Sequence, residues 1–390
     1  MKIRLLTLLC LAAAIAAPGT SSLAKTGDGP IRVLFLGHES EHHNSNLYYP
    51  MLSRALGRDA IYFDYVTSVE EALGDADTLG KFDALLLYAN HGRIEPRQWK
   101  NLKDYVEGGG GFVPVHCASW CFGNEPGFDK LVGGRFKSHQ GAEFAAKIVK
   151  PDHPAMKDVK EFTAWDETYF HNNHNTENRT VLMVRDAMPG DPHTKPEPWT
   201  WVRTQGKGRV FYTASGPDQR VWSHSDFHQL IKSGILWAAG ESAQTRYHAF
   251  LKSRAPLKYV KRDNIPNYEK RPEPLPYQLP LSDAESMKYT QAPVGFRLEL
   301  FAAEPQIVNP IYMQWDERGR LWVAESVDYP NEIKEGRKGN DSIKILEDTD
   351  GDGKCDKVKI FADGLNIPTS VSYTHLRAHE TSLHLVCRLL

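Results

Sequence analysis

Continuous apolar runs alternate with amphipathic segments along the chain from Ile31 onward. Four runs have the uninterrupted apolar character of buried parallel strands, and three segments between them have helical spacing. The predicted strands are 31–37, 60–67, 82–90 and 111–116, and the predicted helices are 46–57, 69–76 and 95–109. This alternation predicts an α/β fold with a flavodoxin-like, doubly wound parallel sheet, in which ligands bind beyond the carboxyl ends of the strands.

The same domain is expected to extend over residues 25–240. The stretch "GKGRVFYTAS" predicts a hairpin-like return of Val, Phe and Tyr into the core, and residues 227–240 predict a closing helix. In that helix Leu230, Ile231 and Ile235 recur at helical spacing, which is typical of a face packed against a core.

Two further regions differ from the first domain in their pattern. Residues 241–285 are rich in Pro, Lys and Tyr without an apolar period, so they are predicted to form an extended linker. Residues 286–369 alternate as strands do, with a D-x-x-G turn and aromatic residues that indicate the start of a β-propeller. One blade cannot bury its own faces, so we expect an incomplete propeller. Residues 370–390 break the strand pattern and are expected to be a non-native tail, and the alternative is a genuine short C-terminal helix.

The chain ends and the charge balance bear on location and partners. Residues 1–24 combine a basic start, an apolar run and a small-x-small site, which predicts a signal peptide and a periplasmic or extracellular protein. No run is long enough to span a bilayer. The 47 Lys and Arg residues balance 49 Asp and Glu residues, which argues against a nucleic-acid partner.

Histidine is abundant, with 16 in the chain, and several follow the predicted strands directly. His38 follows the first strand, His91 and Arg93 the third, and His116 ends the fourth. Because the carboxyl ends of parallel strands meet at one edge, these side chains are expected to share a polar pocket. The alternative is that each histidine caps a turn or faces solvent.

A second group of candidates lies in "WDETYFH". His116 with Glu167, Asp166 and Tyr169 form an acid–base set together with His38. The substrate-binding candidates are His91, Arg93, His139, Trp165 and His171. The alternative for Asp166 and Glu167 is that they cap the start of a helix.

Metal binding is a rival role for the pocket and an expectation for a second place in the chain. His38, His42, His91, His116 and Glu167 include enough nitrogen and oxygen ligands for a divalent metal. In "DTDGDGKCD", four carboxylates fit positions 1, 3, 5 and 9 of a weak Ca²⁺ loop: Asp348, Asp350, Asp352 and Asp356. The alternative for that loop is an Asp-Gly hairpin turn without an ion.

Five ordered motifs carry a resemblance to a known family: "GGGFVPVHCAS", "LVGGRFKSH", "WDETY", "GKGRVFYTAS" and "GILWAAG". The resemblance extends over residues 31–240, about half of the chain, and this region resembles the ThuA-like (trehalose-utilisation) family. The resemblance implies a fold similar to class I glutamine amidotransferases and a small carbohydrate as ligand. It aligns His116, rather than Cys117, with the nucleophile position, and Gly216-Pro217-Asp218 stands where the family usually shows Gly-His-Asp. We therefore expect no glutamine amidotransferase activity.

The second half resembles the opening of the propeller in large exported sugar-dehydrogenase-like proteins, some of which carry haem. No C-x-x-C-H segment is present, so no haem is expected on this chain. Two functions follow as hypotheses: an exported carbohydrate-active enzyme that performs acid–base chemistry on a sugar or oxidised sugar, and a non-catalytic sugar-binding or interaction module of an exported dehydrogenase. The sequence does not specify an oligomeric state.

Overall fold

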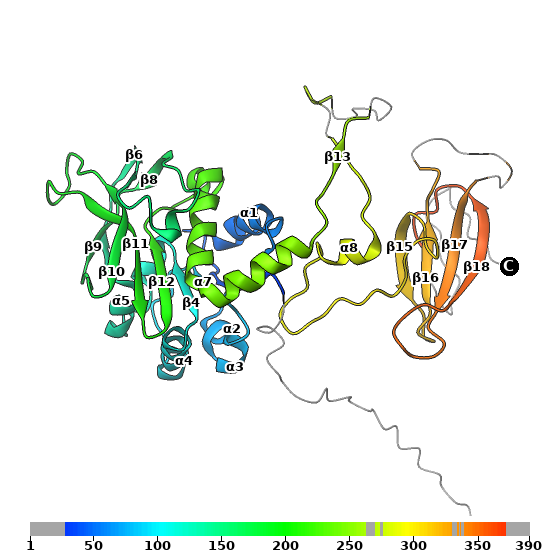
Figure 1. Ribbon diagram of the computed structural model, residues 1–390, viewed down its shortest axis with the longest axis horizontal. Helices are drawn as coiled ribbons and strands as arrows, with labels where there is room; N and C mark the ends of the chain where they lie inside the picture. The colour runs from blue at the N-terminus through cyan, green and yellow to red at the C-terminus, as the bar shows by residue number, and fades with distance from the viewer. Residues whose placement is uncertain are drawn as a thin grey trace, which may run out of the picture. The chain divides into compact units, whose positions relative to one another are not determined.

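A computed structural model of the chain describes residues 28–262, 270–273, 276–329, 334, 336 and 339–371. These residues form two compact units that divide between Arg254 and Ala255 (Figure 1). The predicted signal peptide at 1–24 lies outside the described residues, and so does the predicted tail from residue 372 onward.

The first unit is built on one eight-stranded sheet with the order β2-β1-β3-β4-β12-β11-β10-β7. Its strands are β1 (Ile31–Leu36), β2 (Ile61–Val66), β3 (Ala84–Leu87), β4 (Gly111–Pro114), β7 (Lys147–Ile148), β10 (Arg179–Arg185), β11 (Glu197–Gln205) and β12 (Gly208–Thr213). The four strands predicted before residue 120 are confirmed. Strands β1, β3 and β4 are almost wholly buried, as their uninterrupted apolar runs require, whereas only the first half of β2 is buried.

The sheet is parallel-rich rather than wholly parallel, which corrects the prediction. Strands β2, β1, β3, β4 and β12 pair in parallel, whereas β11, β10 and β7 are antiparallel. The change of direction comes from the short turn between Gln205 and Gly208, where Gly206 adopts a left-handed φ of 58°. Such a two-residue connection can only join antiparallel strands.

Helices alternate with the strands along the first unit. They are α1 (Ser45–Gly57), α2 (Val69–Leu73), α3 (Ala76–Leu79), α4 (Pro96–Glu107), α5 (Pro126–Val132), α6 (Gln219–Trp222) and α7 (Ser225–Ser253). The single helix predicted at 69–76 is divided in two, because Asp75 accepts hydrogen bonds from Asp77 and Thr78 and so caps a new helix.

Helices cover both faces of the sheet. On β12, Phe211 lies against Gly234 of α7, while its neighbour Tyr212 packs on Trp201 of β11. The Trp201 indole donates to the Val132 carbonyl at the end of α5. Because successive residues of a strand point to opposite faces, α7 and α5 lie on opposite sides of the sheet.

Helix α7 continues to Ser253, beyond residue 241 where the linker is predicted to begin. A left-handed Gly240 (φ 86°) bends the helix, and the second half still buries Ala243 and Tyr247. The Tyr247 hydroxyl donates to the Asp59 carbonyl, and Arg246 pairs with Asp83 at 2.6 Å. These contacts with the first unit explain why residues 241–253 belong to it.

Two small antiparallel pairs extend the first unit beyond the strand ends of the main sheet. They are β5 (Arg135–Ser138) with β9 (Phe170–Asn172), and β6 (Gly141–Ala145) with β8 (Thr163–Glu167). Asp166 and Glu167 therefore lie on a strand, and the alternative that they cap a helix is wrong.

The second unit has its own sheet of four antiparallel strands. These are β15 (Pro310–Trp315), β16 (Leu321–Glu325), β17 (Asp341–Glu347) and β18 (Lys357–Leu365), preceded by α8 (Asp283–Met287) and by the pair β13 (Tyr259–Val260) and β14 (Tyr277–Gln278). Alternation along β16 divides its core in two, with Leu321 and Val323 in one apolar cluster and Trp322 in another.

Gly111→Ala tests the close contact between the sheet and α7. A methyl group at Gly111 would lie 2.8 Å from the Ala238 backbone of α7, which cannot move away as a flexible side chain would. We expect a loss of about 1–3 kcal/mol in unfolding free energy, measured by urea denaturation. The control is Gly57→Ala, whose added methyl meets nothing within 4 Å. Equal stability of the two variants would contradict this packing.

Candidate functional site

His116 occupies the turn where β4 leaves the sheet. It is the first residue of a 3₁₀ helix, His116–Trp120, and its φ of 50° is left-handed. A non-glycine residue rarely adopts this conformation, and such strain concentrates at functional sites. The side chain is 0 % exposed. The sharp turn therefore directs the imidazole inward, beneath the carboxyl end of the sheet.

Both ring nitrogens of His116 have partners. Nδ1 lies 2.5 Å from the Ala214 carbonyl oxygen, which follows β12, and Nε2 lies 3.2 Å from Glu167 Oε2. A carbonyl oxygen only accepts, so Nδ1 carries the proton and donates it. In a neutral ring Nε2 would then offer a lone pair to the carboxylate. A lone pair and a negatively charged oxygen repel each other, so this distance requires a proton or another positive charge between Nε2 and Glu167 Oε2.

Glu167, at the end of β8, is the centre of the site. Its Oε2 atom faces His116 Nε2 at 3.2 Å, His139 Nδ1 at 3.8 Å and His43 Nε2 at 4.0 Å. Burial raises the pKa of Glu167, but the hydrogen bond to His116 and the surrounding imidazoles outweigh burial and lower the pKa to about 2. Three imidazoles thus converge on one carboxylate oxygen.

His43 joins this cluster from the loop after β1. Its Nδ1 lies 3.2 Å from the Pro217 carbonyl oxygen, so Nδ1 donates and Nε2 faces Glu167. Burial, together with the neighbouring His116, lowers the pKa of His43 to about 3. Sequence reasoning did not select His43 as a site residue. Its place after the first predicted strand, next to His42, was the signal for it, but neither spacing nor residue type tells which ring turns inward.

A cavity of about 270 Å³ opens in front of the carboxylate. It is lined by His42, His43, Asn90, Trp120, Phe136, His139, Glu167 and Tyr169. His116 lies behind this wall, with the Tyr169 ring stacked on it at 4.1 Å between ring centroids. Among the predicted site residues, Glu167, Tyr169 and His139 face the cavity, and His116 acts on it from behind.

His38 and His91, two of the predicted site residues, support the loops instead. His38 Nε2 donates to the His43 carbonyl at 2.9 Å, and its Nδ1 accepts from the Asn90 amide. The His91 Nε2 donates to the Gly37 carbonyl at 2.9 Å. With both ring nitrogens engaged by the backbone, His38 holds the shape of the loop that carries His43. Arg93 is exposed and lies outside the cavity lining.

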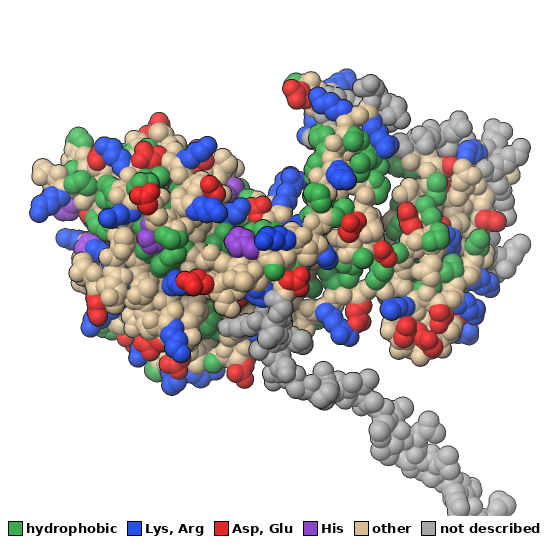
Figure 2. Space-filling view, in the orientation of Figure 1, with side chains coloured by type: hydrophobic (Ala, Val, Ile, Leu, Met, Phe, Trp, Pro, Cys, Tyr) green, Lys and Arg blue, Asp and Glu red, His purple; other side chains and the backbone are tan. Residues whose placement is uncertain are grey.

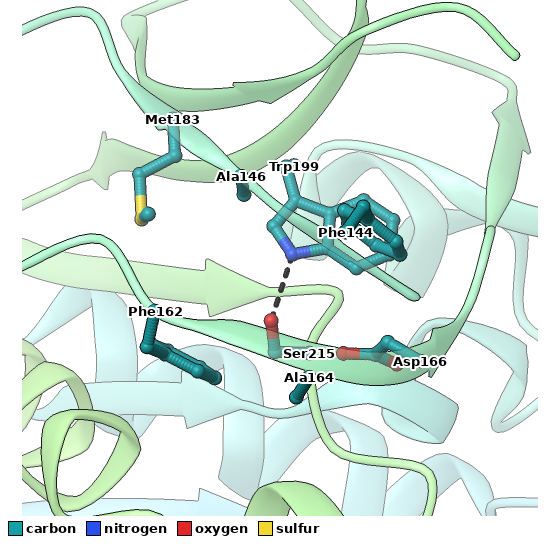
Figure 3. Close-up of a pocket in the computed structure, with 8 residues that line it drawn as sticks. All are labelled: Phe144, Ala146, Phe162, Ala164, Asp166, Met183, Trp199 and Ser215. Atoms are coloured by element: carbon teal, nitrogen blue, oxygen red, sulfur yellow. Dashed lines mark hydrogen bonds between the residues drawn. The ribbon is translucent and has the colours of Figure 1, made fainter. Parts of the chain in front are cut away.

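Asp166 and Trp165 precede Glu167 on β8, but their side chains do not join the three imidazoles around the Glu167 carboxylate. Asp166 borders a small separate cavity, about 10 Å³, beside Ser215 and Trp199 (Figure 3). Burial raises the pKa of Asp166 well above its ordinary value, and its carboxyl accepts from the Glu167 amide at 2.8 Å. Trp165 is covered by the Arg220 guanidinium, 3.7 Å from its ring centroid.

His171 belongs to a buried network beneath the site. Its Nδ1 lies 3.4 Å from Glu197 Oε1, and its Nε2 lies 2.9 Å from the Tyr212 hydroxyl. The same hydroxyl lies 3.0 Å from both the His116 carbonyl and Ser119 Oγ. Because the whole network is buried, His171 holds the His116 turn rather than a ligand.

Two groups of side chains in the described residues have metal-ligand spacing. In the first unit, one ligand atom each from His42, His43 and Glu167 lie within 4.8 Å of one another. In the second unit, Asp348, Asp350 and Asp356 do the same, while Asp352 accepts from the Lys354 amide. Asp348 also accepts from the amides of its own loop. Both alternatives for this loop, a weak Ca²⁺ site and an ion-free turn, fit these contacts.

Cys117 is 1 % exposed, and burial raises the pKa of its thiol well above the ordinary value. Burial also raises the pKa of Cys121 to about 12. Neither pairs with another cysteine among the described residues. A buried, protonated thiol is a poor nucleophile, so Cys117 has the properties of a core residue.

The surface carries both signs of charge. On the face shown in Figure 2, Lys and Arg side chains are interspersed with Asp and Glu over the first unit. Within the described residues, no helix has the length and the apolar character needed to cross a membrane.

Comparison with known proteins matches both units. Residues 32–238, more than half of the chain, match the ThuA family, described as trehalose utilisation, and residues 282–378 match DUF7133, a domain of unknown function. No curated protein matches the chain. The solved structures that are similar include a putative ThuA-like protein from Parabacteroides merdae, with 18 % identity over 54 % of this chain and 90 % of that one and a TM-score of 0.47. A second, from Bacteroides uniformis, has 17 % identity over 56 % of this chain and 98 % of that one, also with a TM-score of 0.47.

The burial of Cys117 and Cys121 predicts their reactivity. In the native chain, we expect iodoacetamide to leave both unlabelled, as mapped by mass spectrometry, and to label both in urea. A cysteine introduced at the exposed position Thr245 (Thr245→Cys) provides a matched accessible thiol. Labelling of native Cys117 at the rate of that thiol would contradict its assignment to the core.

Proposed function

Since this chain belongs to the ThuA family, we propose that its first unit binds a small carbohydrate in the cavity around Glu167 and exchanges protons with it. One observation carries the proposal: three imidazoles converge on Oε2 of a carboxylate that lines the cavity. Groups that give and take protons are most effective when they are held within hydrogen-bonding reach of a bound ligand.

The cavity lining supports a carbohydrate as the ligand. Trp120, which is 42 % exposed, supplies an accessible aromatic surface, and Phe136 and Tyr169 add further apolar area. Asn90 and His139 supply hydrogen-bonding groups on the same wall. A sugar presents C–H faces and hydroxyl edges together, so an aromatic wall with a few polar groups suits it.

Proton exchange is assigned to the groups of the cluster that reach the cavity. His139 has a side chain that is 40 % exposed, and its Nδ1 lies 3.8 Å from Glu167 Oε2 and 3.1 Å from the Gln140 carbonyl oxygen. Because a carbonyl oxygen only accepts, Nδ1 carries the proton, and Nε2 is the atom that can take one from a ligand. A proton taken from a ligand by His139 would be stabilised by the adjacent carboxylate, which makes this pair the acid–base unit. His116, which is fully buried behind Glu167, is a positioning residue.

A non-catalytic sugar-binding or interaction module is the second candidate. It is favoured by the loop at Gly216-Pro217-Asp218, whose middle residue, Pro217, has no titratable side chain and presents its carbonyl to His43. This candidate keeps the cavity and the aromatic wall but involves no proton exchange.

We also propose roles for the remainder of the chain. The four-stranded antiparallel sheet β15–β18 has the strand number of one propeller blade, and we propose that it is the first blade of a dehydrogenase-like propeller. The Asp348 loop is proposed to bind Ca²⁺ weakly in an exported protein. The proposal of export rests on the pattern of residues 1–24.

The test uses the full chain with trehalose and with trehalose oxidised to a ring ketone. Binding is measured by calorimetry, and exchange of the C–H next to the ketone is followed by NMR in D₂O. We expect Trp120→Ala to weaken binding at least about tenfold through loss of the aromatic surface. His139→Ala is expected to retain binding within a few-fold but to lose exchange at least about a hundredfold.

Glu143→Gln, an exposed carboxylate on the neighbouring strand β6, is the control and should change neither property. If wild type binds a sugar without exchange, the non-catalytic module replaces the enzyme. If it binds neither sugar, the carbohydrate assignment fails.

A further inference from the structure

The ring orientations of two buried histidines carry an implication beyond acid–base chemistry. His43 and His116 each donate Nδ1–H to a backbone carbonyl, those of Pro217 and Ala214. Their Nε2 atoms therefore both face Glu167 Oε2, at 4.0 and 3.2 Å. Histidines that bind metals are typically fixed in this way, with the second ring nitrogen donating to a carbonyl or carboxylate.

Positive charge is needed between Glu167 Oε2 and the Nε2 atoms of His43 and His116. Protonation of the imidazoles could supply this charge, but the resulting cations would repel one another. The His43 ring lies 4.8 Å from the His116 ring and 3.9 Å from the His42 ring, between centroids. Protonating all three imidazoles would place like charges side by side around one carboxylate. A single divalent cation would satisfy several nitrogen lone pairs and the carboxylate at once.

A ligand set of suitable type lies at the edge of the cavity. His42, His43 and Glu167 offer two nitrogens and one oxygen within 4.8 Å of one another. Two histidines and a carboxylate are a common catalytic zinc set, in which the remaining coordination position stays open. Here all three ligands line the cavity, so an open position would face a bound molecule. His42 is exposed, and its ring packs against the His43 ring at 3.9 Å between centroids, so its ligand atom already lies beside those of His43 and Glu167.

We propose that His42, His43 and Glu167 bind a divalent cation of the zinc class, and that this ion contacts the oxygen of a carbohydrate in the cavity. The inference rests on the proposed function and deepens it. The ion would polarise a carbonyl or hydroxyl of the sugar. With Glu167 bound to the ion, His139 is the group that remains to exchange a proton. His116 would then orient Glu167 through the contact between its Nε2 and Oε2, without being a ligand of the ion itself.

The experiment measures metal binding to the full chain without sugar. Chelator-treated protein is titrated with Co²⁺, which reports nitrogen and oxygen ligands through its visible absorption, while excess Ca²⁺ fills the Asp348 loop. We expect one Co²⁺ ion per chain, displaced by Zn²⁺. Glu167→Gln and His42→Ala should each weaken Co²⁺ binding at least about tenfold.

Two variants separate metal binding from other effects. His248→Ala removes an exposed histidine on α7 and should leave Co²⁺ affinity unchanged. His139→Ala should also keep Co²⁺ affinity within a few-fold, although it is expected to lose proton exchange. Because His42 is exposed, His42→Ala should retain the melting temperature of wild type, so its loss of Co²⁺ cannot be ascribed to unfolding.

Failure of this inference is distinguishable from failure of the proposed function. Absence of Co²⁺ binding, or binding that persists in both His42→Ala and Glu167→Gln, overturns the metal site. If the chelator-treated chain still binds and exchanges the sugar, the proposed function holds without a metal. If the chain binds Co²⁺ tightly but binds no sugar, the metal site stands and the proposed function fails.

Discussion

The contact between the His116 imidazole and the Glu167 carboxylate is the interaction on which the rest of the site depends. It joins the end of β4 to the end of β8, two strands that belong to different sheets. The ring can make this contact only because His116 takes up a left-handed backbone conformation and because Ala214 accepts its Nδ1 proton. Removing either condition would turn Nε2 away from the carboxylate.

The buried surroundings of this pair explain why the geometry is fixed. The Tyr169 ring stacks on one face of His116, and the Tyr212 hydroxyl binds its carbonyl oxygen. The Tyr212 hydroxyl is hydrogen-bonded to His171, and the other ring nitrogen of His171 contacts the Glu197 carboxylate. Polar groups that are buried and fully paired resist movement, because breaking one bond leaves a desolvated partner. A rigid support of this kind places Glu167 at the cavity wall.

Much of the first unit could be predicted from the sequence, because its strands are buried on both faces and its helices are amphipathic. The position of His116 at the end of β4 followed from the same pattern. Side-chain direction in the loops could not be predicted. His38 and His43 both follow β1, yet hydrogen bonds with distant backbone groups decide that His38 supports the loop and His43 enters the site.

Two other differences have the same origin in tertiary contacts. Residues 241–253 are predicted as linker because the predicted closing helix ends at Gly240. Tyr247 and Arg246 instead contact Asp59 and Asp83, and α7 continues to Ser253. Asp166 and Glu167 are adjacent acids, and strand geometry sends them to different surroundings. One carboxyl is buried beside Ser215 and Trp199, and the other meets the imidazoles at the cavity.

The tautomer of His116 reports directly on the direction of its ring. Long-range ¹⁵N–¹H correlation spectra of ¹⁵N-histidine-labelled chain report which ring nitrogen is protonated, and the signals missing from His116→Gln identify this residue. The structure predicts a protonated Nδ1, as donation to the Ala214 carbonyl requires. A neutral His116 ring with its proton on Nε2 and none on Nδ1 would show that the ring does not donate to Ala214.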